Sequence, residues 1–403
     1  QPPSTPTCTT PTSNPLTGPD LSAVTFSLVD LYGPYAVSST DGRMALLARY
    51  REASFGGRLA NRVWTGSEWQ TWDLHGTTTS GGFGGGGNLR SIHVNGRIES
   101  VASSTIAGVT GLYVYTENET HDGFEETPVR IADVDSGYLV SAGGLEQEGY
   151  AAMTGSGSIR GTGHNVIIIE RSASGVWNAS GVLPAGTPAG ASLRTAAVGY
   201  HFDGTPWLIY KETVGTATTL KLSRRVGAGW RTGIVVDPAI SLYDDDRVET
   251  SVMDAQKIML NWNSTVAGAR QVKAASYDLE TYTLGTAQTL PAGAGSSCPN
   301  CVAGGIAFEA DGIHGIYVMH ESRSGATPLN AAWLGTIEGE DFAPAESFAP
   351  DFAVLGTVRA HYDACGNGFM TFWGREARTP SAPIDFQVVP IPAREPDAAA
   401  AGI

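Results

Sequence analysis

Charged residues are scarce in this chain, and basic residues are the scarcest. Only 16% of the 403 residues are charged, and 25 lysines and arginines face 40 aspartates and glutamates, so the formal net charge is −15. A nucleic-acid partner requires a basic surface that displaces counterions from phosphates, and an anionic membrane surface requires the same. The composition therefore argues against both classes of partner.

Long apolar runs are also missing. Apolar runs such as Val166 to Ile169 have the length of a strand, whereas a membrane-spanning helix needs about 20 apolar residues. No membrane insertion is therefore expected. Residues 1–20 lack the basic start and the apolar stretch of a signal peptide. If the chain is exported, Gln1 is expected to be a processed N-terminus.

Local catalytic motifs are absent too. The sequence contains neither G-x-S-x-G nor H-E-x-x-H, which removes the local signatures of nucleophile-elbow hydrolases and zincins. The glycine-rich stretch from His75 to Asn88 lacks the Gly-Lys-Ser/Thr ending of a phosphate-binding loop. It is interpreted as a lid or an adhesive loop.

Glycine, by contrast, is abundant, with 51 residues, and turn signals recur at a regular spacing. Four Asp-Gly or Asn-Gly pairs lie between strand-like apolar segments: Asp41-Gly42, Asn95-Gly96, Asp203-Gly204 and Asp311-Gly312. Such pairs favour tight hairpins, because type I′ turns need positive φ at both central residues. The glycines are 54, 108 and 108 residues apart. The same step predicts three further turns: Glu148-Gly149, Asp254 to Gln256, and Cys365-Gly366.

A second marker keeps the same step, because Trp69, Trp177 and Trp230 each follow a glycine-containing turn. Within one unit, four strands are predicted: Leu193 to Phe202, Pro206 to Lys211, Thr219 to Arg225, and Trp230 to Val236. Four short antiparallel strands in each repeat are typical of a propeller blade. The sequence therefore predicts an all-β protein, a seven-bladed β-propeller over residues 21–392. Residues 1–20 form a Pro/Thr/Ser-rich leader, and residues 393–403 form a flexible tail.

The two ends of the repeat region complement each other. The seventh unit has three predicted strands, and Val24 to Val29 is a spare strand that would complete it and close the ring. This closure brings Cys8 towards Cys365 and leaves Cys298 and Cys301 to form a local disulfide. In the alternative, Cys8 is disordered and unpaired. A zinc or redox role for Cys298 and Cys301 is disfavoured, because no further ligand pair and no βαβ context accompanies them.

The turn-Gly-x-Trp segments 172–177 and 225–230 resemble degenerate Asp-box repeats of sialidase-like propellers. The resemblance implies the architecture and covers most of the chain. In the Asp-box an aspartate precedes the glycine, whereas Thr65, Ala173 and Ala228 stand at the related positions here. The arginine triad, nucleophilic tyrosine and acid of sialidases cannot be mapped, so their activity is not carried over.

Loops after the second strand of several units carry a basic residue or a histidine followed by glutamate. The candidate ligand-binding residues are Arg51, Glu52, Lys211, Glu212, His320, Glu321, Arg323, Arg375 and Glu376. A ring of such residues on one face would orient a polar ligand such as a sugar or a uronate. The alternative is a set of solvated or inter-blade ion pairs, which contribute little.

The densest acidic run contains Asp244, Asp245 and Asp246. Calcium binds several carboxylate and carbonyl oxygens, so this loop is a candidate structural calcium site. It lacks the spacing and the glycine of an EF-hand, and a solvated acidic loop is the alternative. No other cofactor is predicted.

These features favour a secreted or cell-surface binding or scaffold propeller that recognises glycans or a surface protein through its loop face. Nine tryptophans and fourteen tyrosines are available for stacking on such a partner. Two alternatives stay open. One is a carbohydrate-active enzyme, either a polysaccharide lyase or a glycosidase, whose residues converge only in space. The other is a subunit of an extracellular assembly.

Overall fold

A computed structural model describes residues 35–38, 44–52, 56–64, 73–75, 90–120, 124–125, 127–131, 134–145, 149–159, 166–201, 203–240, 248–254, 256–266, 269–291, 301–309, 311–321, 332–348, 353–354, 358–362, 366–375 and 385–391. Every regular element within these ranges is a β-strand, so the expected all-β class is confirmed. No helix in the described part of the chain has the length and apolarity needed to cross a bilayer.

The strands form seven antiparallel sheets in chain order. The first three sheets contain β1 (Tyr35–Ser38), β2 (Met44–Glu52), β3 (Gly56–Trp64) and β4 (Asp73–His75); β5 (Arg90–Val94), β6 (Arg97–Ile106), β7 (Val109–Thr116) and β8 (Val129–Arg130); and β9 (Val134–Leu145), β10 (Tyr150–Ile159), β11 (Val166–Arg171) and β12 (Trp177–Gly181).

In each of the next three sheets, two short strands take the place of a single fourth strand, and both pair with the third strand. They contain β13 (Ser192–Tyr200), β14 (Pro206–Val214), β15 (Ala217–Val226), β16 (Gly229–Trp230) and β17 (Ile234–Asp237); β18 (Glu249–Val252), β19 (Lys257–Val266), β20 (Ala269–Asp278), β21 (Thr283–Leu284) and β22 (Gln288–Thr289); and β23 (Cys301–Phe308), β24 (His314–Glu321), β25 (Ala332–Glu338), β26 (Asp341–Phe342) and β27 (Glu346–Phe348).

The last sheet has three strand lines. Its members are β28 (Ala353–Val354), β29 (Arg359–Tyr362), β30 (Gly368–Arg375) and β31 (Asp385–Pro390). Both β28 and β29 pair with the same edge of β30, and β31 pairs with the other edge. Three strand lines are what the sequence predicts for the seventh unit. Val24 to Val29, the segment predicted to complete it, lies outside the described residues, so ring closure stays a prediction.

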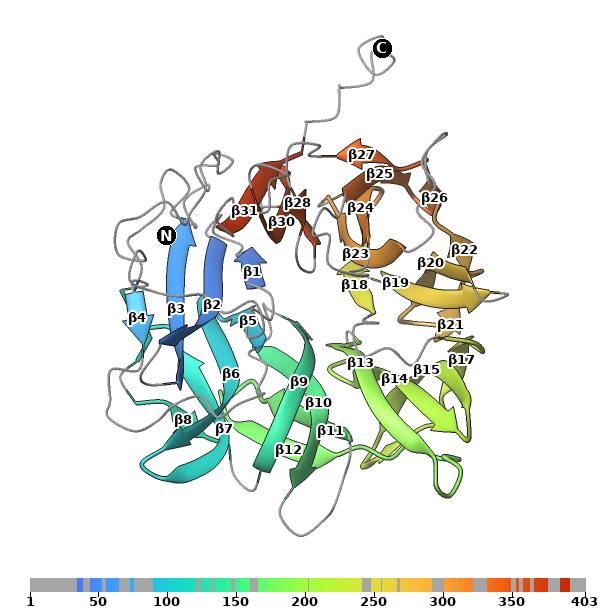
Figure 1. Cartoon of the computed structure of the whole chain (residues 1–403). Helices are drawn as coiled ribbons and strands as arrows, with labels where there is room; N and C mark the ends of the chain where they lie inside the picture. Colours follow the sequence, from blue (N-terminus) through green and yellow to red (C-terminus); the bar gives the residue numbers. More distant parts are fainter. Residues whose placement is uncertain are drawn as a thin grey trace.

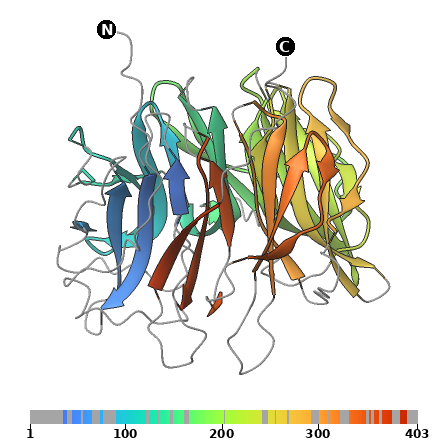
Figure 2. The same cartoon turned by 90° about the horizontal axis from the view of Figure 1, so that it is seen from above.

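The sheets are arranged as the blades of a β-propeller around a common centre, with the first strand of each sheet innermost (Figure 1). Seen from the side, the strands run between two faces (Figure 2). Buried apolar side chains lie between successive blades, and one such layer joins Trp207 and Leu222 of one sheet to Leu260 and Trp262 of the next. The sheet of β18–β22 therefore buries both of its faces by packing on its two neighbours.

The turns follow the predicted spacing. Asn95 and Gly96 have φ values of 52° and 75°, which is the left-handed pair that a type I′ hairpin requires. Gly149, Gly204, Gly312 and Gly366 also have positive φ, and each lies between the first and second strand of its sheet. Glycine adopts this region without the steric cost of a Cβ atom, which explains why the repeat is visible through its glycines.

The tryptophan marker has a structural reason as well. Trp177, the first residue of β12, donates a hydrogen bond from Nε1 to Glu99 in the preceding blade. Trp230 forms a β-bridge with Pro184, which follows the preceding blade, and packs with the Ile168 and Val182 side chains. The recurrent tryptophan therefore anchors the outer strand of one blade to the blade before it.

Cys301 begins β23, is buried, and is disulfide-bonded. Cys8, Cys298 and Cys365 lie outside the described residues, so the pairings Cys298–Cys301 and Cys8–Cys365 stay predictions. Asp41-Gly42, Trp69 and the acidic residues Asp244, Asp245 and Asp246 also lie outside the described residues.

Candidate functional site

The candidate ligand-binding residues fall at equivalent places in their blades. Arg51 and Glu52 end β2, His320 and Glu321 end β24, Arg375 ends β30, and Lys211 and Glu212 lie near the end of β14. These four strands are the second strands of their blades, so their ends meet one face of the propeller, which is called here the rim. Arg323 and Glu376 lie outside the described residues, as do the side chains of Arg51, Glu52, Glu321 and Arg375.

Lys211 and Glu212 are both buried, with 6% and 5% of their surface exposed. Glu212 pairs with Lys221 of the adjacent strand β15. Glu212 therefore forms an ion pair within its own blade. The neighbouring Tyr210 is also buried, and burial, followed by the charge of Glu212, raises its pKa.

His320 is half-buried at the end of β24. Burial and then the positive charge of Arg270 lower its pKa to about 4, so the imidazole is neutral at physiological pH. A neutral imidazole carries one donor and one acceptor nitrogen. At the rim this histidine is therefore a hydrogen-bonding group rather than a cation.

Both rim residues have one covered polar atom without a hydrogen-bond partner in the described part of the structure. These atoms are Oε2 of Glu212 and Nδ1 of His320. Buried polar atoms in folded proteins are nearly always satisfied by protein, water or ligand, so each exception requires an explanation. A carboxylate oxygen and a neutral imidazole nitrogen are both suited to hydroxyl groups.

The innermost strands contribute an ion pair of their own. Arg359 of β29 pairs with Glu249 of β18, and one sheet lies between their two sheets in chain order. Both side chains are largely buried, with 20% and 12% exposure. The arginine and glutamate neutralise each other, so this pair contributes to holding the inner strands together.

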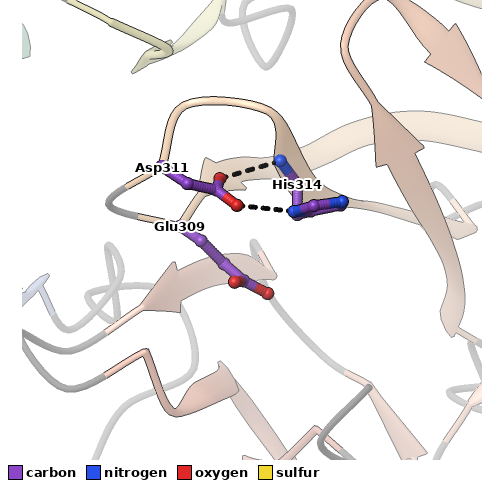
Figure 3. Close-up of side chains that lie close together, drawn as sticks. All are labelled: Glu309, Asp311 and His314. Carbon is purple, nitrogen blue, oxygen red and sulfur yellow. Dashed lines mark hydrogen bonds and ion pairs between the residues drawn. The ribbon is translucent and has the colours of Figure 1, made fainter. Parts of the chain in front are cut away.

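A second group of polar side chains lies in the turn between β23 and β24. Glu309, Asp311 and His314 bring one ligand atom each to within 4.8 Å of one another (Figure 3). Asp311 Oδ1 accepts hydrogen bonds from the Ile313 and His314 amides at 2.9 and 3.0 Å. Asp311 Oδ2 lies 2.5 Å from His314 Nδ1. Burial acts to raise the pKa of Asp311, but these hydrogen bonds outweigh it and the pKa lies below its usual range.

The neighbouring blade adds Tyr362, the last residue of β29, to this group. Burial, the charge of Glu309 and a hydrogen bond to Glu309 raise the pKa of Tyr362 to about 12. The hydroxyl therefore stays protonated and donates to Glu309. Together the four side chains offer two carboxylates, one imidazole and one phenol.

The sequence interpretation missed this group, although a signal was present. Glu309 stands three residues before the turn glycine, where His93 and His201 stand in other blades. The repeat predicts a structural role for His201, and its Nδ1 does hydrogen-bond the Leu279 carbonyl in the next blade at 3.0 Å. The signal for this group was a glutamate at a position that holds histidine in two other blades, together with His314 in the same turn.

Three histidines with lowered pKa values should make the stability of the protein depend on pH. Burial lowers the pKa of His201, and burial followed by nearby arginines lowers those of His320 and His361, the last to about 3. The unfolded chain, with histidine pKa values near 6.5, binds these protons first. Stability should therefore fall as pH drops from about 6.5 towards 4.

Thermal unfolding measured between pH 7.5 and 4.5 checks this expectation, because carboxyl groups with lowered pKa values contribute only at lower pH. The variant His361→Gln should show a smaller decrease in Tm over that range than the wild type. His361 stacks on Phe369 and contacts Thr371, so the variant will be less stable overall, and the slope is the informative quantity. An unchanged slope would contradict the assignment.

The fold and these groups define the protein as a β-propeller of four-stranded antiparallel blades with polar groups on both faces. No family model matches the chain, and no curated protein matches it. Similar solved structures include a protein of unknown function from Dyadobacter fermentans, with 10% identity, a TM-score of 0.49 and coverage of 79% of this chain and 98% of that chain.

Two further similar structures have titles that name an activity. The first is an ulvan lyase of polysaccharide lyase family PL25, with 13% identity, a TM-score of 0.47 and coverage of 78% and 80% of the two chains. The second is the sialidase NanB from Streptococcus pneumoniae, with 11% identity, a TM-score of 0.41 and coverage of 91% and 70%. Identities this low do not indicate what the present chain binds, and the Asp-box resemblance stays a prediction.

Proposed function

We propose that the protein is a secreted or cell-surface carbohydrate-binding propeller that recognises neutral glycans at the rim. The observation that supports the proposal most is that two atoms, Oε2 of Glu212 and Nδ1 of His320, have no hydrogen-bond partner in the described part of the structure. Sugar hydroxyls both donate and accept hydrogen bonds, so they complement a carboxylate oxygen and a neutral imidazole. The two atoms are covered in the free chain, and side-chain rotation of the kind common at interfaces would open them.

The positions of the two residues favour an extended ligand. Glu212 belongs to the blade of β13–β17 and His320 to that of β23–β27, with one blade between them in chain order. A monosaccharide bound at one residue would not reach the other, whereas an oligosaccharide that follows the rim would contact both.

Charge favours neutral over anionic glycans. The chain has a net charge of −15. One carboxylate oxygen of Glu212 already forms an ion pair with Lys221. A uronate or sialic acid beside the second oxygen would place two negative charges together, which is unfavourable. Neutral oligosaccharides avoid this repulsion.

A glycan array containing neutral and anionic oligosaccharides tests the proposal. The wild type should bind neutral chains, and the variants Glu212→Gln and His320→Phe should each weaken binding by about 10-fold or more, as expected when a hydrogen bond to a charged or buried group is lost. Glu346→Gln is the matched control, because Glu346 is exposed on the outer strand β27. Preference for anionic glycans, or wild-type binding by both rim variants, would contradict the proposal.

Turnover distinguishes the enzymatic alternative. The same glycans are incubated with the protein and analysed for new reducing ends and for unsaturated uronates. Binding without either product supports a binding propeller. Turnover that is lost in Glu212→Gln or His320→Phe would replace the proposal with a carbohydrate-active enzyme, and the absence of both binding and turnover would favour an assembly subunit.

A further inference from the structure

The structure assigns a divalent transition-metal site, of the kind that binds Zn²⁺, to Glu309, Asp311 and His314 in the turn between β23 and β24. This site lies at the opposite end of β24 from His320, because β24 begins at His314 and ends at Glu321. It is therefore separate from the rim and independent of the proposed glycan binding.

Three ligand atoms converge in this turn. One ligand atom from each of the three side chains lies within 4.8 Å of the other two, and Asp311 Oδ2 and His314 Nδ1 are already 2.5 Å apart (Figure 3). Zn²⁺ binds imidazole nitrogen and carboxylate oxygen at about 2.0–2.2 Å, so small side-chain shifts would place all three atoms around one ion. Two carboxylates also balance the charge of a dication.

The backbone that holds these side chains is fixed. Glu309 N donates to His314 O at 2.8 Å, and Gly312 N donates to Glu309 O at 3.0 Å. Gly312 has a φ of +69° and fits so closely against the preceding blade that a Cβ there would overlap the Met253 carbonyl oxygen. A fixed turn lowers the entropic cost of gathering ligands.

The equivalent turns of the other blades distinguish this turn from an ordinary one. Asp203 and Asp254 also accept hydrogen bonds from backbone amides of their turns, so the turn role of Asp311 is shared among blades. The residues three positions after Asn95, Asp203 and Asp254 are Ile98, Pro206 and Lys257. Among the described turns, only that of β23 and β24 places a histidine there and a glutamate two positions before the aspartate.

The adjacent blade supports one of these ligands. Tyr362 donates a hydrogen bond to Glu309. Partners of this kind orient ligating carboxylates in metal sites. The bond also means that an ion held by Glu309 would connect the β23–β24 turn to β29.

The chemistry of the donors selects the ion. Calcium takes six to eight oxygen ligands, whereas one imidazole and two carboxylates suit zinc and similar ions. Three protein ligands leave a position for water or for an oxygen atom of a partner.

Titration of the chelator-treated full-length chain with Zn²⁺, followed by calorimetry and equilibrium dialysis, tests the assignment. The wild type should show one saturable site that His314→Gln abolishes and that Tyr362→Phe weakens by about 10–100-fold. Asp203→Asn is the matched control, because it removes an equivalent turn carboxylate that lacks the histidine and glutamate, and its Zn²⁺ binding should equal that of the wild type.

Three results would overturn the assignment. They are no saturable Zn²⁺ site in the wild type, unchanged binding in His314→Gln, and stronger binding of Ca²⁺ than of Zn²⁺ at the site. Circular dichroism confirms that each variant is folded, and Tyr362→Phe leaves all three ligands in place if His314→Gln does not fold. A Zn²⁺-dependent rise in Tm that is present in Asp203→Asn and absent in His314→Gln would add independent support.

Discussion

Replacement of Glu99 by glutamine should lower the free energy of unfolding by about 3–5 kcal/mol, the range for breaking a buried ion pair. Glu99 of β6 is 5% exposed and accepts from Arg171 Nε at 2.8 Å through Oε1 and from Trp177 Nε1 through Oε2. Glutamine offers one acceptor and one donor, so one of these two donors would face an amide NH₂ group. Arg171 would also remain as a buried charge without its counterion.

A matched control exists on the surface of the same blade. Glu119 pairs with Arg97 at 3.2 Å, but its side chain is 86% exposed. Because solvent screens such pairs, Glu119→Gln should change stability by about 1 kcal/mol or less. Urea unfolding of both variants gives the comparison. Equal destabilisation by the two changes would show that the Glu99 contacts do not hold the blades of β5–β8 and β9–β12 together.

The double variant Glu99→Leu with Arg171→Met separates the two contributions. Replacing both charges with apolar side chains of similar size removes the unpaired charge, and such replacements are often neutral or stabilising. The double variant should therefore be more stable than Glu99→Gln. A double variant that is less stable than the single one would indicate that the hydrogen bond from Arg171 to the Gly149 carbonyl, at 2.7 Å, matters more than the ion pair.

The blades could be predicted from the sequence because the signals that define them are local. Asn95 and Gly96 take positive φ for reasons contained in two residues, and the predicted strand from Pro206 to Lys211 lies within β14. Where the prediction differs, the cause is tertiary. The strand predicted from Trp230 to Val236 is divided into β16 and β17, because both short strands pair with different parts of β15.

The polar contacts could not be predicted, because they join residues that are distant in sequence or face directions fixed only by packing. Glu99 and Arg171 are 72 positions apart, and nothing at either position indicates the other. Lys211 and Glu212 are adjacent in sequence, but neighbouring residues of a strand point to opposite faces of the sheet. Glu212 therefore meets Lys221 on the next strand instead.

The two candidate sites illustrate the same distinction. The rim residues were identified because their position in the blade repeats, and the structure supplied the burial and the unpartnered atoms. The turn group of Glu309, Asp311 and His314 breaks the repeat instead. Departures from a repeat are informative in a protein of this type, because the common residues serve the fold and the exceptions are free to serve something else.

Replacement of Gly305 by alanine should also destabilise the protein strongly. Gly305 lies in the irregular part of β23, and a Cβ there would overlap the Ala360 backbone nitrogen and lie 2.9 Å from the Arg359 carbonyl carbon. Both atoms belong to β29, the innermost strand of the next blade. Backbone atoms on an innermost strand cannot rotate away as a side chain can, so the blades must separate.

The expected cost is about 3 kcal/mol, the upper part of the usual range for overpacking. Gly229→Ala is the control, because a Cβ added at Gly229 would meet no atom within 4 Å and the residue has no positive φ. That change should stay within about 0.5 kcal/mol of the wild type, the range for surface substitutions. Urea unfolding of both variants provides the measurement. If Gly305→Ala is as stable as Gly229→Ala, the innermost strands β23 and β29 do not approach each other this closely. The close packing of these two neighbouring blades at the centre would then be contradicted.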